Sequence, residues 1–203
     1  MSSFPVPQSD SWDRLKKECR ECYACDLCRT RTNLVFGVGN EQADIMLIGE
    51  GPGEQEDLQG FPFVGPAGQF LDDMLEIIDL DRKQVYIANI VKCRPPHNRD
   101  PLPEEAAACR SWLERQIALV NPLLIVCLGR IAAGCLIHSN FRITREHGRW
   151  FPYGNRKILA TFHPSALLRD PSRRPEAFMD LREIRREYHA TLQDRGYAAT
   201  SSV

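Results

Sequence analysis

Three short apolar runs recur along the chain, and residues that favour turns bound each of them. A run of this length is typical of a strand that is buried on both faces of a sheet. The runs extend over residues 43–49, 84–91 and 122–129, and residues 156–162 form a fourth candidate. We therefore expect four strands at these positions.

Segments with helical patterns alternate with these runs. In residues 66–80 the apolar positions at helical spacing are Phe70, Leu71, Met74, Leu75 and Ile78. Residues 103–120 begin with Pro-Glu-Glu, which is typical of a helix start, and a last helix is expected at residues 175–192. Strands that alternate with helices predict an α/β fold: a three-layer α/β/α sandwich with a mainly parallel central sheet of about four strands.

Composition fits one compact domain over residues 1–203, with frayed ends at about 1–10 and 198–203. Hydrophobic residues make up 43% of the chain and charged residues 26%. The longest apolar stretch, residues 123–128, is too short to cross a bilayer, and no signal peptide pattern begins the chain. We expect a cytoplasmic monomer under reducing conditions, so the 8 cysteines are metal ligands or buried thiols rather than disulfides.

The charge is unevenly distributed although its net value is -1. Residues 41–81 hold eleven carboxylates and no Lys or Arg, whereas residues 142–174 hold eight basic residues and two acidic ones. Aromatic residues interleave with the basic ones, as on a nucleic-acid surface. They are Trp150, Phe151, Tyr153 and Phe162. The alternative is two solvated faces of opposite charge.

Ligands of parallel α/β sheets bind beyond the carboxyl ends of the strands. This rule indicates residues 50–65, 89–99 and 163–169, together with the stretch after Gly129. Two nucleotide-binding motifs fail here. Glu54 stands where a dinucleotide fingerprint needs its last glycine, and Pro66 stands where a phosphate loop needs lysine.

The cysteines indicate a metal site. Four of them are three residues apart, at Cys19, Cys22, Cys25 and Cys28, and Cys93 and Cys109 follow downstream. A zinc ribbon usually closes with a second short pair, which is missing. Ferredoxin-type ligation stays open as a second choice, although its longer final gap and its proline are absent. Cys127 and Cys135 lie in apolar surroundings and are expected to be core thiols.

Four motifs together resemble the iron-sulfur, family-four uracil-DNA glycosylases. They are GEGPGEQED (49–57), GFPFVGPAGQFL (60–71), IANIVKCRPPHNRDPLP (87–103) and HPSALLR (163–169), and the resemblance extends from about residue 22 to about residue 186. It implies a 4Fe-4S cluster of structural role on Cys22, Cys25, Cys93 and Cys109. Cys22 and Cys25 are preferred to Cys19 and Cys28 because the distance from Cys25 to RTRTNLVFG resembles the family's spacing.

The resemblance also implies a monofunctional hydrolase of base excision repair. Such an enzyme breaks the N-glycosidic bond of uracil in single- or double-stranded DNA, releases free uracil and leaves an abasic site. His163 would donate a hydrogen bond to a uracil oxygen as negative charge develops there. Phe63 would stack on the flipped base, and Asn89 would read the uracil edge and reject cytosine.

Residues after His163 are expected to contact DNA. Leu167 resembles the residue that wedges into the space left by the base, and Leu168 is the neighbour with which it can be confused. Ser165 and Arg169 would hold phosphates, and Lys92 or Arg94 could do the same.

The residue that positions the attacking water is less clearly indicated. Better-known branches of the superfamily have an Asp where this chain has Gly51, which we place in the substrate-binding set. Glu50 is therefore the first candidate and Glu56 the second, with a loop-bracing carboxylate as the alternative for Glu56. His97 is expected to be a solvated or phosphate-facing loop residue. The remaining histidines, His138, His147 and His189, are expected to be structural.

Two other functions are considered beside the glycosylase. One is a protein that binds or covalently captures uracil-containing DNA with little turnover, which would leave a protein-DNA adduct after denaturation. The other is an iron-sulfur electron carrier, for which the loops around Glu50, Phe63 and His163 would be surplus. No membrane partner is expected.

Overall fold

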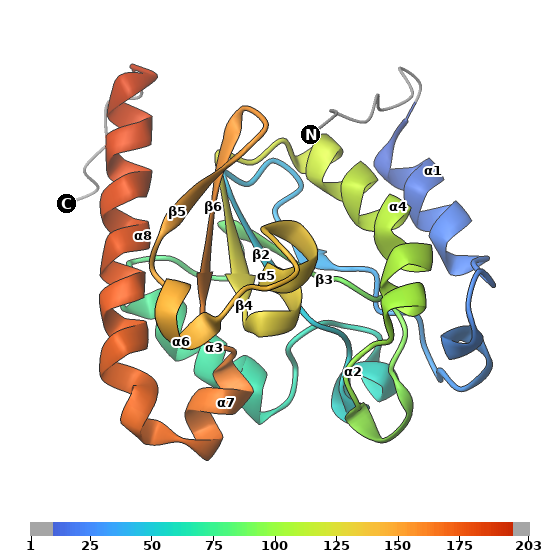
Figure 1. Ribbon diagram of the computed structural model, residues 1–203. Helices are drawn as coiled ribbons and strands as arrows, with labels where there is room; N and C mark the ends of the chain where they lie inside the picture. Colours follow the sequence, from blue (N-terminus) through green and yellow to red (C-terminus); the bar gives the residue numbers. More distant parts are fainter. Residues whose placement is uncertain (1–9, 197–203) are drawn as a thin grey trace.

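The computed structural model describes residues 10–196, and these form three layers with one sheet between two layers of helices (Figure 1). Parallel strands occupy the centre of the sheet in the order β3-β2-β4-β6. They are β2 (Ile45–Gly49), β3 (Val85–Asn89), β4 (Leu124–Leu128) and β6 (Arg156–Thr161). The predicted sandwich with a mainly parallel sheet is confirmed, and each of the four expected strands is present.

The sheet has 6 strands, so the expectation of about four was too low. β1 (Val38–Gly39) pairs antiparallel with β3, and β5 (Trp150–Tyr153) pairs antiparallel with β6, so both lie at the edges. β1 is too short to leave an apolar pattern in the sequence. β5 contains Pro152, which cannot donate a ladder hydrogen bond and is tolerated only at an edge or a bulge.

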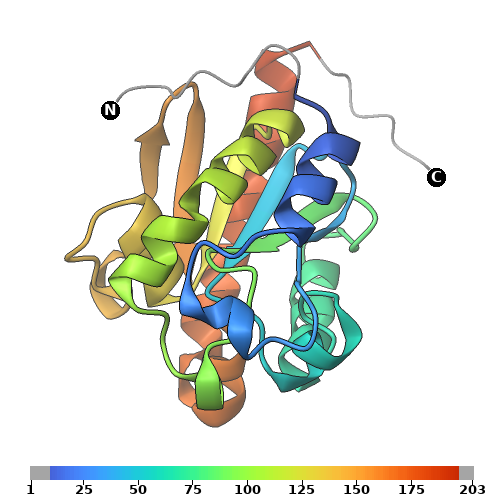
Figure 2. The same cartoon turned by 90° about the vertical axis from the view of Figure 1, so that its right-hand side faces the viewer.

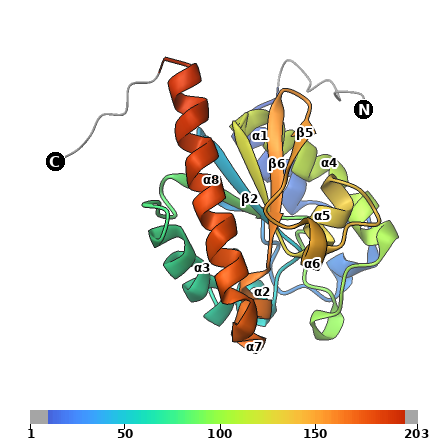
Figure 3. The same ribbon diagram turned by 60° about the vertical axis from the view of Figure 1, so that its left-hand side comes forward.

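Helices cover both faces of the sheet (Figures 2 and 3). One layer contains α1 (Trp12–Arg20), α4 (Pro103–Val120) and α5 (Arg130–Leu136), and the other contains α3 (Pro66–Glu76) and α8 (Arg174–Asp194). Shorter elements lie in the connections: α2 (Glu54–Gln59), α6 (Ile143–Glu146), α7 (Pro164–Arg169) and the 3-10 turns Asp26–Arg29, Pro96–Asn98 and Pro171–Arg173. The three expected helices are confirmed, although the first ends at Glu76 rather than residue 80.

Alternating side chains of each central strand enter two different cores. In β2, Ile45 and Leu47 pack with α3 and α8, whereas Met46 and Ile48 pack with α4 and α5. Every residue of β2, β3 and β4 is buried, as expected for strands covered on both faces. The continuous apolar runs of the sequence have this double burial as their cause.

The chain ends were expected to be frayed. Residues 1–9 and 197–203 lie outside the described residues. Asp10, the last residue of the expected N-terminal frayed segment, is different, because its buried carboxylate accepts two hydrogen bonds of 2.7 Å from Arg115 of α4. Among residues 10–196, no helix is long and apolar enough to cross a membrane.

Candidate active site and cysteine pocket

The carboxyl ends of the parallel strands bring three of the predicted motifs to one side of the sheet. Gly49 of β2 is in register with Asn89 of β3, and the ladder continues past both strands, because Ile90 N–H donates to the Gly49 carbonyl. On the other side of β4, β6 leads to His163 at the N-cap of α7. α2 and α7 lie at this side of the molecule, the lower side in Figure 1.

Phe63, Asn89 and His163 form a compact cluster at the end of β2 beside Gly49, and we refer to this cluster as the pocket of the candidate site. The Phe63 and His163 rings stack with centroids 5.6 Å apart and an angle of 29° between their planes. A Cβ atom on Gly49 would lie 2.4 Å from Asn89 Oδ1 and 2.8 Å from Phe63 Cζ. Only glycine allows the amide and the ring to approach the strand this closely, so the sequence position 49 has a role that we did not predict.

The Phe63 backbone is held in an unusual conformation with φ of +53°. Arg82 stabilises it, since its Nη2 donates to the Phe63 carbonyl at 2.5 Å and to the Gly68 carbonyl at 3.0 Å. Gly68 packs against the same carbonyl, which a Cβ atom at this position would approach to 1.8 Å. Sequence reasoning missed both Arg82 and Gly68. Arg82 lies outside the recognised motifs, and Gly68, although it lies within GFPFVGPAGQFL (60–71), has no side chain that suggests a role.

Asn89 carries an unpartnered polar atom inside the pocket. Its side chain is 2% exposed, and its Oδ1 has no hydrogen-bond partner among the described residues. Its main-chain carbonyl accepts a hydrogen bond of 2.8 Å from Lys92 Nζ. A buried acceptor without a partner costs free energy, so a ligand that donates an N–H hydrogen bond to Asn89 Oδ1 would bind favourably here.

His163 is held as a neutral donor. Ser165 N–H donates to its Nδ1 at 3.1 Å, and Ser165 Oγ lies 2.8 Å from the same atom. Nδ1 therefore acts as an acceptor, which places the ring proton on Nε2. Burial lowers the pKa of His163 to about 4, and the positive charge of Arg169 acts in the same direction. Ser165, expected to bind phosphate, is thus already bonded to the histidine.

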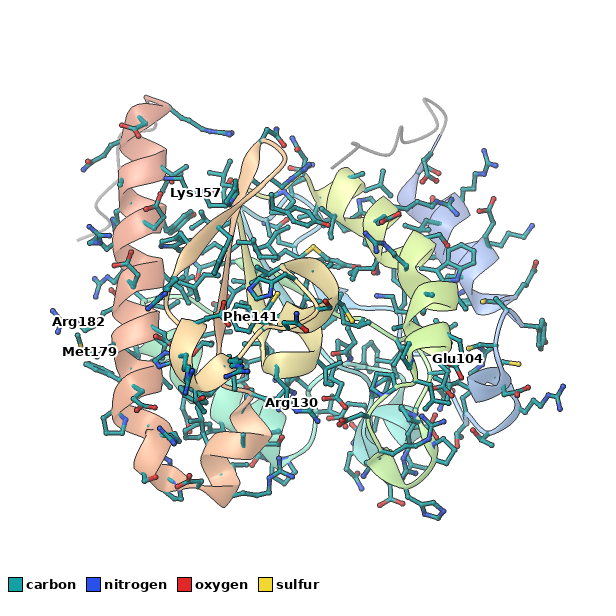
Figure 4. All side chains as sticks on the ribbon, viewed as in Figure 1. Glu104, Arg130, Phe141, Lys157, Met179 and Arg182 are labelled. Atoms are coloured by element: carbon teal, nitrogen blue, oxygen red, sulfur yellow. The ribbon has the colours of Figure 1, made fainter. Side chains whose placement is uncertain are left out.

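Glu50 lies directly after β2 and is partly buried. Burial raises its pKa to about 7, and the negative charge of Asp100 adds to the increase, while Arg130 and Arg169 oppose it. Asp100 is in turn paired with Arg130, which Figure 4 places at the lower side of the sheet. Glu50 is therefore a carboxylate that can take up or release a proton near neutral pH.

Glu56 has the loop-bracing role that was considered as its alternative. One carboxylate oxygen accepts hydrogen bonds of 2.9 and 3.0 Å from Val64 N–H and Gly65 N–H, and the other accepts one of 3.1 Å from Gly53 N–H. These bonds cap α2 and fix the turn that presents Phe63. Because the backbone already donates to both oxygens, we favour this bracing role over the positioning of water.

The expected DNA contacts differ in their exposure. Leu167 is 1% exposed and packs in the core, whereas Leu168 is 38% exposed, so the wedge assigned to Leu167 is at odds with its burial. The Arg169 side chain is exposed. Lys92 is buried and cannot reach a phosphate, while Arg94 lies 3.6 Å from Glu54. Gly51 lies in the loop after Glu50, against Val91.

The aromatic residues of the basic segment do not form a surface as expected. Phe162 is buried, Phe151 and Tyr153 pack against one core, and Trp150 packs against the other. His97 is exposed in the loop after Cys93, as expected. His147 is bonded to Asp180 at 2.8 Å and His138 to Glu146 at 2.9 Å, in agreement with structural roles.

A second pocket lies between α4 and the N-terminal segment. The cysteines that line it are Cys22, Cys25, Cys28, Cys93 and Cys109. The fourth cysteine of the N-terminal run, Cys19, is fully buried on α1 and does not line this pocket. The structure thus brings the four predicted ligands together and adds Cys28.

Hydrogen bonds to sulfur reach three of the four predicted ligands. Trp112 Nε1 donates to Cys22 at 3.3 Å, Arg31 Nη1 to Cys93 at 3.1 Å and Lys92 N–H to Cys109 at 3.3 Å. Burial raises the pKa of Cys25, and the backbone N–H of Leu27 opposes this increase. No hydrogen bond to Cys28 Sγ is found in residues 10–196. Such donors stabilise thiolates that ligate a metal.

The two remaining cysteines do not share one environment. Cys127 is buried in β4, as expected of a core thiol. Cys135 is exposed, so its expected place in the core is corrected. The buried residues of this 7-residue helix are Ala132, Ala133 and Leu136, and they leave Cys135 on a flank that the core does not cover.

The anchoring of the N-terminal segment connects this pocket to the active-site side. The buried Asp57 of α2 accepts hydrogen bonds from the backbone of Thr32 and Asn33, of which the shortest is 2.9 Å. Val35 N–H donates to the Lys92 carbonyl at 2.8 Å. Residues 22–35 are thus bonded both to the loop after β3 and to the helix after the Glu50 loop.

Comparisons with known proteins show the family of this chain. The model of the uracil DNA glycosylase superfamily matches residues 36–184. A type-4 uracil-DNA glycosylase of Archaeoglobus fulgidus is 45% identical over 86% of this chain and 92% of its own length. One of Thermotoga maritima is 46% identical over 78% and 83%, and a type-5 enzyme of Thermus thermophilus is 36% identical over 64% and 68%. With its pocket of Phe63, Asn89 and His163, this chain belongs to the type-4 family of the uracil DNA glycosylase superfamily.

Proposed function

We propose that this protein hydrolyses the N-glycosidic bond of uracil in DNA, as the names of its type-4 relatives say of them. The observation that carries the proposal is the unpartnered Oδ1 of buried Asn89 beside the Phe63 ring. Uracil carries a proton on N3 and can donate it to this oxygen. Cytosine has no proton on N3 and would leave the buried acceptor unpaired, which favours uracil strongly.

His163 supports the departure of the base. Negative charge develops on the uracil oxygens as the glycosidic bond breaks, and the Nε2 proton of a neutral imidazole can stabilise it. Its ring lies beside the Phe63 ring, with centroids 5.6 Å apart, so a base that stacks on Phe63 would lie close to the imidazole. Free uracil then leaves, and water completes the abasic site.

Glu50 is the proposed acceptor of the proton of the attacking water. Because its pKa is raised to about 7, we expect the excision rate to rise with pH through about 7 as the carboxylate forms. His163 should add no further pH dependence of the excision rate above about pH 5, since its pKa of about 4 keeps it neutral there. Single-turnover rates from pH 5 to 9 would show this rise, and Glu50→Gln should remove it. If the rate of the variant still rises through the same pH range, a group other than Glu50 is responsible.

Leu168 is the proposed wedge, since it is exposed where Leu167 is buried. Leu168→Ala should slow excision from duplex DNA roughly tenfold while leaving the free energy of unfolding unchanged. Flipping a base out of the stack costs a few kcal/mol, and a leucine that fills the space left by the base would offset part of this cost. Leu167→Ala should instead lower the free energy of unfolding by about 2–5 kcal/mol. Urea denaturation and single-turnover excision separate the two effects. A duplex-specific defect of a stably folded Leu167→Ala would restore the wedge to Leu167.

The cysteine pocket is proposed to hold a 4Fe-4S cluster. No group of three or more His, Cys, Asp or Glu in residues 10–196 is arranged to hold a metal ion as it stands, but a four-iron cluster spreads its thiolates more widely. The N–H donors around Cys22, Cys25, Cys93 and Cys109 fit that group. Burial raises the pKa of Cys109 to about 11, so the cluster would also stabilise the thiolate form. The bound cluster would tie residues 22–25 to the loop after β3.

Single cysteine replacements test this ligand set. Cys22→Ala should reduce the iron content and the visible absorbance of the purified protein by more than half, because a cluster ligand is lost. Cys28→Ala should retain both, since no N–H donor to its sulfur is found in the described part of the chain, and Cys19→Ala should retain both because Cys19 does not line the pocket. Loss of iron in Cys28→Ala with retention in Cys22→Ala would show that the ligand register is wrong.

An excision assay tests the proposed reaction itself. Oligonucleotides with one uracil, either single-stranded or opposite G or A, would be incubated with the protein, treated with alkali and run on a denaturing gel. Uracil-dependent strand breaks support the glycosylase and give its strand preference. A shifted band that survives denaturation would support covalent capture instead, and Asn89→Ala is the matched variant that should lose the breaks in either strand context.

A further inference from the structure

A buried lysine lies between the cysteine pocket and the base pocket. Lys92 follows β3 by three residues, is 1% exposed and lines the cysteine pocket together with Cys93 and Cys109. Its ammonium donates to the Asn89 carbonyl at 2.8 Å. The side chain thus spans the distance from the sulfur atoms to the residue whose amide faces the base pocket.

The ammonium has no carboxylate partner. Among the ion pairs of residues 10–196 none involves Lys92, and the titratable groups that face it are the thiols of Cys109, Cys19 and Cys93. A buried charge without an opposite charge is strongly destabilising. Protonated thiols would leave the ammonium uncompensated, whereas the thiolates of an iron-sulfur cluster would compensate it.

The main chain of Lys92 is engaged in the same region. Its N–H donates to Cys109 Sγ at 3.3 Å, and its carbonyl accepts from Val35 N–H at 2.8 Å. One residue therefore bonds to the helix α4 cysteine, to the N-terminal segment and to Asn89. Through these bonds, Lys92 directly connects the cysteine pocket to the end of β3.

We propose that Lys92 is the internal counter-charge of the cysteine centre and couples the occupancy of that centre to the geometry of Asn89 in the base pocket. This inference rests on the proposed cluster and base pocket and adds to them a positioning residue that acts through Asn89. A four-iron core bound by four thiolates is anionic, so a fixed cation beside it stabilises the bound cluster. By reciprocity, a base bound at Asn89 should stabilise the cluster as well.

Iron release to an excess of chelator tests the proposal without relying on activity. We would compare the iron-loaded wild type with Lys92→Met, which keeps an unbranched side chain one atom shorter and removes its charge. Lys83→Met is the control, because Lys83 is exposed. Lys92→Met should release iron about 10- to 100-fold faster than both, as expected when a group next to the ligands is lost. Its reduction potential should also be lower, because a positive charge near the cluster favours the reduced state.

The coupling has its own readout. An oligonucleotide with 2′-fluoro-2′-deoxyuridine, whose glycosidic bond resists cleavage, should slow iron release from the wild type and Lys83→Met at least about fivefold. It should have no effect on Lys92→Met. Equal slowing in all three proteins would overturn the coupling, and equal release rates without DNA would overturn the counter-charge.

Folding of the variant is addressed by Lys92→Arg. If Lys92→Met does not fold because the positive charge is lost, Lys92→Arg, which keeps a positive charge, should fold and retain iron. Failure of both variants to fold would overturn the charge role, because a charged and a neutral side chain would then behave alike. A wild type that never carries iron would reject the proposed cluster instead, so the two failures can be distinguished.

Discussion

Replacing His163 with alanine should slow uracil excision by about 10²- to 10³-fold at neutral pH, while the protein stays folded. This is the typical effect of removing one preorganised donor to a developing anion. The donor is prepared before the base arrives, because Ser165 N–H occupies Nδ1 and the lowered pKa keeps the ring neutral. Single-turnover rates on a uracil-containing duplex, with circular dichroism as a folding control, would measure it.

His97→Ala is the matched control for this variant. His97 is an exposed histidine of the loop after Cys93, outside the stack of Phe63 and His163, so its loss should change the rate less than about twofold. Glu50→Gln should slow excision less than removal of Phe63 and His163 together, because leaving-group stabilisation dominates the barrier. Equal or greater loss in Glu50→Gln would place the larger contribution on activation of water.

The central fold could be predicted from the sequence because double burial leaves a simple mark. β2, β3 and β4 have every side chain covered, so each reads as an unbroken apolar run between turns. β5 leaves no such mark, since its side chains are half-buried or exposed and Pro152 interrupts it. The edges of a sheet depend on pairing with a neighbour, which no local pattern records.

The candidate site was predictable only where a motif carries chemistry. His163, Phe63 and Asn89, which were selected from motifs, lie together in the structure, and the four selected cysteines line one pocket. Which side of a short helix is covered cannot be read from a motif, and Leu167 and Leu168 show this, since they differ in burial within α7. Glu56 shows that a carboxylate in such a motif can brace a loop, since the backbone donates to both of its oxygens.

The supporting roles of Lys92 and Arg82 could not be predicted from the sequence for a different reason. Both are basic residues that suggest phosphate contacts or solvent, yet Lys92 donates inward to the Asn89 carbonyl and Arg82 to the Phe63 carbonyl. Each one fixes the backbone of a residue that lines the base pocket. Such supporting bonds depend on how the loops fold in space, and they fix the position of the motif residue.

Replacing Gly49 with alanine should reduce excision by at least about 10²-fold. The added methyl group would overlap both Asn89 Oδ1 and the Phe63 ring, at 2.4 and 2.8 Å, and displacing a pocket residue by about 1 Å is enough for a loss of this size. Overpacking should also lower the free energy of unfolding by about 1–3 kcal/mol. Excision rates under single turnover, with urea denaturation in parallel, would measure both quantities.

Gly134→Ala separates the crowding at Gly49 from the general effect of removing a glycine. Gly134 lies in α5 with nothing within 4 Å of its Cβ position, so the substitution should leave excision unchanged and raise the free energy of unfolding by up to about 1 kcal/mol. Full activity in Gly49→Ala would mean that Asn89 and Phe63 can both retreat and still hold the base. The close approach at the end of β2 would then have no part in catalysis, and the tight pocket would be a feature of packing alone.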